Sequence, residues 1–207
     1  MKKNLGLFLA IILVQIAPFI SAADTLHPLI YKIDIKKEIS NTTRLYLSNG
    51  LAEAYALGAD AVLIHMNTYG GQVDAADSMR TAILYNPIPV YVFIDNNAAS
   101  AGALISIACK KIYMRKGANI GAATVVNPTG EAMPDKYQDT IVQKNDTLYK
   151  WKRDPLIAEA MVDERVAIPN LIDTGKVLTF TAQEAQKWGY CDGIAENPDE
   201  VITQYLG

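Results

Sequence analysis

The sequence AVLIHMNTYGG, which occupies residues 61–71, decides the fold. Its first part, Ala61–Met66, is a continuous apolar run broken by a single histidine, which is typical of a strand buried on both faces of a sheet. The pair Gly70–Gly71 closes a tight turn, and apolar residues at helical spacing follow from about Val73 to Tyr85. A buried strand that passes through a turn into a helix indicates parallel strands covered by helices.

The same order of elements recurs on both sides of this stretch. Strands are predicted at residues 29–35, 90–94, 112–114 and 177–180, and helices at residues 45–57, 100–109 and 156–166. Residues 95–99 are expected to form a small polar turn, and Thr181 with Glu184 forms a capping box that opens a further helix. The sequence therefore predicts an α/β fold with a mostly parallel sheet in one domain, residues 24–207.

The composition narrows the possible functions. Half of the 207 residues are apolar, charged residues make up 20% and the net charge is −3. A chain of this length can bury one sizeable core, and this charge balance argues against a nucleic-acid partner.

The first 23 residues have the character of a secretory signal peptide. Lys2 and Lys3 precede the apolar run Leu5–Ile20, and Ser21-Ala22-Ala23 offers a small-residue cleavage site. An uncleaved membrane anchor is the alternative, which Gln15 and Pro18 disfavour because they shorten the run. Export favours hydrolysis over cofactor chemistry, so no cofactor is expected.

Two cysteines and two histidines bear on the redox and metal chemistry. In an oxidising compartment Cys109 and Cys191 could form a disulfide, or they could be two buried apolar side chains. Because these residues and the histidines, His27 and His65, lack ligand spacing, no metal site is expected.

Two strand-to-helix turns are candidates for a site, because such turns meet at the carboxyl edge of a parallel sheet. Gly70–Gly71 lets the backbone approach a ligand, although glycine also serves ordinary turns. In Ala99-Ser100-Ala101-Gly102 the serine is flanked by very small residues, as a nucleophile requires, although serine also caps helices. Together the two turns favour a nucleophile beside outward-facing amides.

The sequence resembles the ClpP/crotonase superfamily, and within it the NfeD-type membrane-bound serine proteases, which are relatives of signal peptide peptidase A. The resemblance covers residues 29–206 and is carried by the segments Gly70–Ala76, Ala99–Gly102, Ile120–Ala122 and Leu178–Ala185. It implies a spiral of β-β-α units and a serine–lysine catalytic dyad.

Matched position by position, the resemblance implies roles for five residues. Ser100 corresponds to the nucleophile, and Lys136 corresponds to the base. The oxyanion donors correspond to Gly71, together with Gly70, and to the backbone of Ala101. The family's helix after this lysine is longer than the stretch between Lys136 and Leu156 allows, so a shortened helix is expected here.

The positions of the histidines and lysines in the sequence also favour Lys136 as the base. His27 and His65 both precede the nucleophile, and His65 lies in a buried strand, where a satisfied core histidine is expected. Lysine serves as a base only when neutral in an apolar environment. Other lysines are less suitable. Lys110 and Lys111 lie roughly 15 Å along the helix from the serine, and Lys144 stands in a polar stretch. Lys150 and Lys152, in a charged patch with Arg153 and Asp154, are expected to face water.

Three functions are therefore open. The first is an exported serine endopeptidase on the extracytoplasmic side of the membrane; the resemblance implies hydrophobic segments of a stomatin- or prohibitin-like protein as substrate, a homodimer, and membrane helices that follow residue 207. The second is a catalytically silent scaffold of the same fold. The third, an acyl-CoA enzyme, is disfavoured by export.

Overall fold

The computed structural model describes residues 28–124, 126, 129, 131, 151 and 153–207. The predicted signal peptide, residues 1–23, and Lys136 lie outside the described residues. A seven-stranded sheet forms the centre, with the main strand order β1-β2-β3-β4-β7 and parallel pairing throughout that path. Its strands are β1 (Ile30–Ile35), β2 (Ala61–Thr68), β3 (Val90–Ala99), β4 (Lys111–Met114), β5 (Asn119–Gly121), β6 (Thr179–Thr181) and β7 (Gly193–Ile194).

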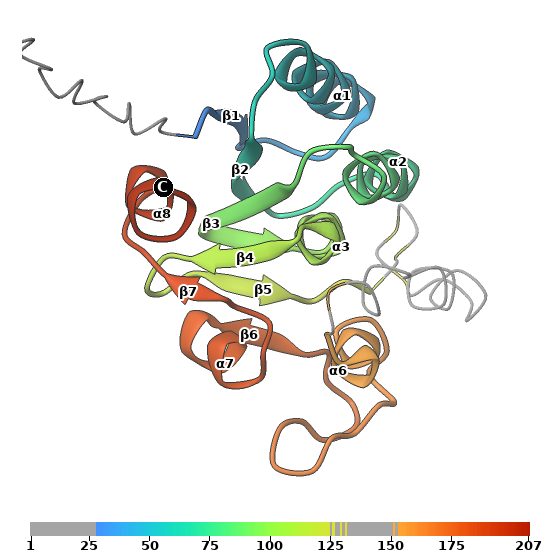
Figure 1. Ribbon diagram of the computed structural model, residues 1–207. Coiled ribbons are helices and arrows are strands. Elements are labelled where there is room, and N and C mark those ends of the chain that lie inside the picture. Colours follow the sequence, from blue (N-terminus) through green and yellow to red (C-terminus); the bar gives the residue numbers. More distant parts are fainter. Residues whose placement is uncertain (1–27, 125, 127–128, 130, 132–150, 152) are drawn as a thin grey trace, which may run out of the picture.

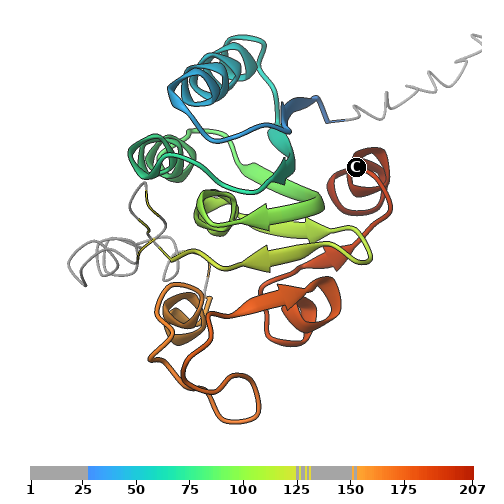
Figure 2. The same cartoon turned by 180° about the vertical axis from the view of Figure 1, so that it is seen from behind.

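Helices cover both faces of this sheet (Figures 1 and 2). The described helices are α1 (Asn41–Ala56), α2 (Val73–Leu84), α3 (Ala101–Ala108), α6 (Pro155–Ala160), α7 (Ala182–Lys187), α8 (Pro198–Val201) and the π-helix η1 (Ile202–Leu206). The first three form a row along one face, and α8 with η1 lies on the other (Figure 1). The α/β fold with a mostly parallel sheet is thereby confirmed.

Side-chain caps fix the starts of two helices. The Ser40 hydroxyl accepts from the Thr43 amide and begins α1. Thr181 and Glu184 form the predicted capping box of α7, with both reciprocal hydrogen bonds present.

One predicted turn is wrong, because β3 continues through residues 95–99. Asn97, Ala98 and Ala99 pair in parallel with β5, and Thr68 pairs with Ala98 after a register shift in β2. This pairing keeps the chain extended up to Ser100, so the nucleophile candidate follows a strand directly. Local sequence signals do not reveal this extension, because the partners in β5 lie more than twenty residues further along the chain.

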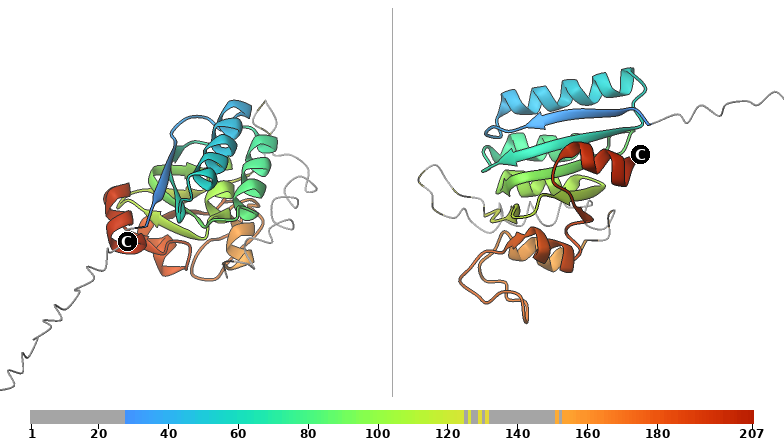
Figure 3. Two further views of the ribbon diagram at one scale, coloured as in Figure 1. Left: turned by 45° about the horizontal axis from the view of Figure 1, so that its top comes forward. Right: turned by 90° about the vertical axis from the view of Figure 1, so that its left-hand side faces the viewer.

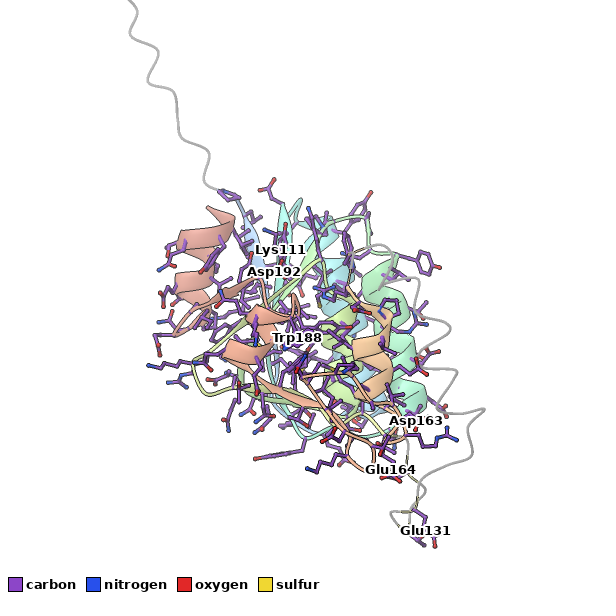
Figure 4. The ribbon with its side chains drawn as sticks, turned by 90° about the horizontal axis from the view of Figure 1, so that it is seen from below. Lys111, Glu131, Asp163, Glu164, Trp188 and Asp192 are labelled. Carbon is purple, nitrogen blue, oxygen red and sulfur yellow. The ribbon has the colours of Figure 1, made fainter. Side chains whose placement is uncertain are left out.

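The ends of the described domain lie together at the amino ends of the strands. Val201, Ile202 and Leu206 pack in a small apolar cluster with Leu63 and Ile30, and Ile30 begins β1. Figure 3 shows the C-terminus beside the start of β1. In Figure 4 Lys111, the first residue of β4, and Asp192 lie toward this end, whereas Asp163, Glu164 and Glu131 lie toward the other.

Among the described residues, no helix combines the length and apolar character needed to cross a bilayer.

Candidate active site

Ser100 connects β3 directly to α3 in a backbone conformation that few side chains adopt. Its φ is 53° and its ψ −120°. The Ser100 amide donates to the carbonyl of Gly121 at 3.0 Å, while the amides of Ala103 and Leu104 already donate to the Ser100 carbonyl. Strand pairing on one side and the helix on the other thus force a conformation that costs about 1–3 kcal/mol.

The Ser100 hydroxyl does not cap the helix. Although Ser100 occupies the N-cap position of α3, its side chain makes no cap hydrogen bond within the described chain, unlike Ser40 and Thr181 at the starts of α1 and α7. The capping role that a serine commonly has is therefore absent here, and the hydroxyl remains half-exposed at the positive end of the helix dipole.

The Gly70–Gly71 turn lies against Ser100 and depends on the absence of side chains. A Cβ at Gly70 would lie 2.7 Å from the Ser100 Cβ and 3.1 Å from its Oγ. A Cβ at Gly71 would lie 2.1 Å from the backbone oxygen of Ile39. Both glycines also have positive φ values, 112° and 150°. Any larger residue would separate the turn from the serine or from Ile39.

Pairing with Ile39 sets the direction of the Gly71 amide. The Ile39 amide donates to the Gly70 carbonyl and the Gln72 amide donates to the Ile39 carbonyl, both at 2.8 Å. In a parallel bridge of this kind, the residue between the two bonded peptides directs its own N–H and C=O away from the partner. Gly71 therefore presents its N–H on the side away from Ile39, and the Ala101 amide, in the first turn of α3, has no intrahelical acceptor.

These groups line one small pocket of about 50 Å³, which several water-sized groups can fill. Gly71, Ser100 and Ala101 form its polar side. The rest of its lining is mainly apolar and consists of Val73, Ala76, Leu104, Ala123, Thr124 and Val126. The structure thus brings together four of the five predicted site residues. Gly71, Ser100 and Ala101 line the pocket, and Gly70 lies against Ser100.

The fifth, Lys136, falls in residues 132–150, which lie outside the described residues, and so does Lys144. The lysines within the described chain are all exposed, and none of them lines the pocket. Lys110, for example, lies 5.8 Å from the centre of the Tyr91 ring. The base accordingly stays a prediction.

Arg153, which belongs to the charged patch around Lys150 and Lys152, is buried, whereas these two lysines lie outside the described residues. The Arg153 side chain is 3% exposed, and its Nη1 donates to the carbonyls of Ile107 and Cys109, both at 3.0 Å. The Trp151 indole donates to the carbonyl between them, that of Ala108. The end of α3 opposite Ser100 is thus capped by side chains 43–46 residues away, which sequence spacing does not reveal.

His65 is a satisfied structural histidine, as predicted. Its Nδ1 lies 3.0 Å from an Asp34 oxygen and its Nε2 3.4 Å from an Asp95 oxygen, while Arg115 contacts the other Asp95 oxygen at 2.7 Å. Burial alone would raise the pKa of Asp95, but hydrogen bonds from Arg115 and His65 and their charges outweigh burial and lower it.

The two cysteines are buried side chains and do not form a disulfide. Cys109 and Cys191 are both free and buried. Burial raises the pKa of Cys109 to about 12 and that of Cys191 to about 11, so both thiols are unreactive at neutral pH. In the described part of the chain, no group of three or more potential ligands is placed to hold a metal ion.

The sequence is similar to a known protein family and to curated proteins. Residues 29–206 match the model of the NfeD1b N-terminal domain. Membrane protein NfeD1b of Bacillus subtilis is 33% identical over 177 residues, and Membrane-bound protease PH1510 of Pyrococcus horikoshii is 26% identical over 188 residues. These alignments cover 84% and 86% of this chain, which spans about 40% of the length of either relative.

Solved structures show the same fold. A lysine-to-alanine mutant of the 1510-N membrane-bound stomatin-specific protease, in complex with a substrate peptide, aligns with a TM-score of 0.74 and 24% identity over 86% of this chain and 80% of that one. ClpP1 from Listeria monocytogenes aligns with a TM-score of 0.62 and 20% identity over 82% and 93% of the two chains. The fold is therefore ClpP-like, and the chain belongs to the family of NfeD1b N-terminal domains.

Proposed function

We propose that this chain is the peptidase domain of a membrane-associated serine endopeptidase. The observation that carries the proposal is the Ser100 hydroxyl, which is free of any cap bond in the described chain and is held by a strained backbone against the Gly70–Gly71 turn. The relationship to a membrane-bound protease of the same family supports it.

In the proposed reaction Ser100 Oγ attacks the carbonyl carbon of a peptide bond. The amides of Gly71 and Ala101 donate to the oxygen that becomes negatively charged, which is the role of an oxyanion hole. The C–N bond then breaks, the proton from Ser100 passes to the leaving amine, and water hydrolyses the acyl-enzyme to release the new carboxylate. Lys136 is the base we propose, and it must be neutral to accept the proton.

The pocket supports a preference for polypeptides with an apolar side chain beside the cleaved bond. Val73, Ala76 and Leu104 line the space next to Ser100 and offer such a side chain an apolar surface. A stomatin-like protein as substrate, an extracytoplasmic location and a homodimer are proposed from the family relationship. The relative 1510-N is named as specific for a stomatin homologue.

A fluorophosphonate probe tests this proposal, because it reacts with activated serine hydroxyls. We expect covalent labelling of the full chain, which disappears in Ser100→Ala and falls at least about 100-fold in Lys136→Ala, in line with the usual contribution of a general base. Circular dichroism would establish that both variants are folded. Absence of labelling in the folded wild-type chain would refute the proposal that the chain is a serine peptidase and favour a scaffold of the same fold.

A further inference from the structure

The last residue of β2, Thr68, connects three segments that build the site. Its side chain is buried, with 2% of the residue exposed. The hydroxyl donates to the Lys37 carbonyl at 2.8 Å and accepts from the Gly70 amide at 3.2 Å. A longer contact of 3.4 Å to the Gly70 carbonyl oxygen competes for the same proton. One hydroxyl thus holds the glycine turn to the loop that precedes α1.

The methyl group of Thr68 contacts the third segment, the first turn of α3. A Cβ placed on Gly102 would lie 2.7 Å from the Thr68 Cγ2, so Gly102 and the threonine methyl fit closely together. Ala101, which lines the pocket, directly precedes Gly102. The same side chain therefore touches the elements that carry both amides of the site.

This contact adds a second restraint to the glycine turn, beside the backbone pairing with Ile39. Without side chains, Gly70 and Gly71 have unusual conformational freedom. The backbone bonds from Ile39 and Gln72 fix one side of the Gly71 peptide, and Thr68 fixes the amide of Gly70 that precedes it. Rotation about Gly70 would change the direction in which the Gly71 N–H points.

We propose that Thr68 is a positioning residue for the oxyanion site, an inference that rests on the proposed function. Its hydroxyl orients the Gly70–Gly71 peptides, and its methyl sets their separation from α3. Because an oxyanion forms only in the transition state, removal of the hydroxyl lowers the rate of the chemical step and hardly changes binding of the probe.

Two substitutions separate these roles. Thr68→Val removes the hydroxyl and keeps the shape, whereas Thr68→Ser keeps the hydroxyl and removes the methyl. For the full chain we expect Thr68→Val to lower the limiting rate of fluorophosphonate labelling about 10- to 100-fold, since small displacements of a catalytic group have effects of this size. The probe concentration at half-maximal rate should change less than about twofold, and Thr68→Ser should recover most of the rate.

A neighbouring threonine provides the matched control. The Thr43 hydroxyl donates to the Glu38 carbonyl at 2.8 Å, one residue from the carbonyl that Thr68 contacts. Thr43→Val removes a bond of the same kind and length without touching the glycine turn, and should label at the wild-type rate. The proposal is overturned if Thr68→Val also labels at that rate, or if Thr68→Ser is as slow as Thr68→Val.

Hydrogen exchange distinguishes this inference from failure of the proposed function. In Thr68→Val the Gly70 amide loses its acceptor and should exchange at least about tenfold faster, while Thr68→Ser and Thr43→Val keep the wild-type rate at Gly70. If the wild-type chain is not labelled, the proposal that the chain is an enzyme fails, and the proposed oxyanion role of Thr68 fails with it. The exchange rates would still decide whether Thr68 holds the glycine turn in place. If the Gly70 amide exchanges at the wild-type rate in Thr68→Val, the proposal that Thr68 holds the glycine turn is overturned too.

Discussion

Two polar regions at neighbouring strands of one sheet differ in how fully their groups are paired. Around His65, every charged side chain has a partner, from Asp34 on β1 through Asp95 on β3 to Arg115 after β4. Around Ser100, the polar groups are a hydroxyl without a cap bond in the described chain and the amides of Gly71 and Ala101, two residues that line the pocket. The region with more titratable groups is thus the structural one.

The difference has a physical origin. Fully paired charges stabilise their own arrangement and leave nothing for a ligand to satisfy. A strained serine and two available amides cost stability, and such groups persist where a substrate completes their hydrogen bonds. Substitutions in the two regions should therefore act differently, those near Ser100 on reactivity and those near His65 on stability.

The largest effect is expected for Gly71→Ala. The new methyl would lie 2.1 Å from the Ile39 backbone oxygen, so the turn must move. We expect the labelling rate to fall at least about 100-fold. Gly117→Ala is the matched control, because Gly117 also has a positive φ, 90°, but open space around its Cβ position. It should lower stability by about 1–2 kcal/mol and leave labelling unchanged. Equal labelling of the two variants would contradict the proposed closeness of Gly71 to the reaction.

A moderate effect on stability is expected at Ser100 itself. Both Ser100→Gly and Ser100→Ala remove the nucleophile, but only glycine adopts a φ of 53° without strain. Relief of the strain should make Ser100→Gly about 1 kcal/mol more stable than Ser100→Ala, after the larger backbone entropy of unfolded glycine is included. Urea denaturation measures the difference. If Ser100→Ala were the more stable variant, the backbone there would not be strained.

The smallest effect is expected for Asp95→Asn. The pKa of Asp95 is lowered in the folded protein from its ordinary value of 3.8, so its stabilising contribution is present above pH 3.8 and is lost as the pH falls through the folded-state pKa. Since Asp95 is partly exposed, the variant should lose no more than about 1 kcal/mol at pH 7.

The pH dependence of that difference is the decisive measurement. Unfolding free energies of Asp95→Asn and the wild type should converge as the pH falls below 3.8, and labelling at pH 7 should agree within about twofold. A labelling rate reduced as strongly as in Gly71→Ala would place the His65 region in the mechanism and remove the contrast between the two regions.

Local features were predictable from sequence, whereas long-range contacts were not. The buried strand at residues 61–66, the capping box at Thr181 and the small residues around Ser100 are signals within one element. The extension of β3 to Ala99 depends on β5, and the roles of Thr68 and Arg153 depend on carbonyls 31 and 44–46 residues away. Such contacts form only when the sheet assembles.

The first and last described segments of the chain lie together, and this has a practical consequence. Residue 206 packs near Ile30 at the amino ends of the strands, while Ser100 follows the carboxyl end of β3. A tag or tether joined after Gly207 would leave the domain on the side opposite the pocket. Molecules immobilised through that residue would present Ser100 to the solution, which makes surface-bound labelling and peptide-capture assays feasible without obstruction of the cleft.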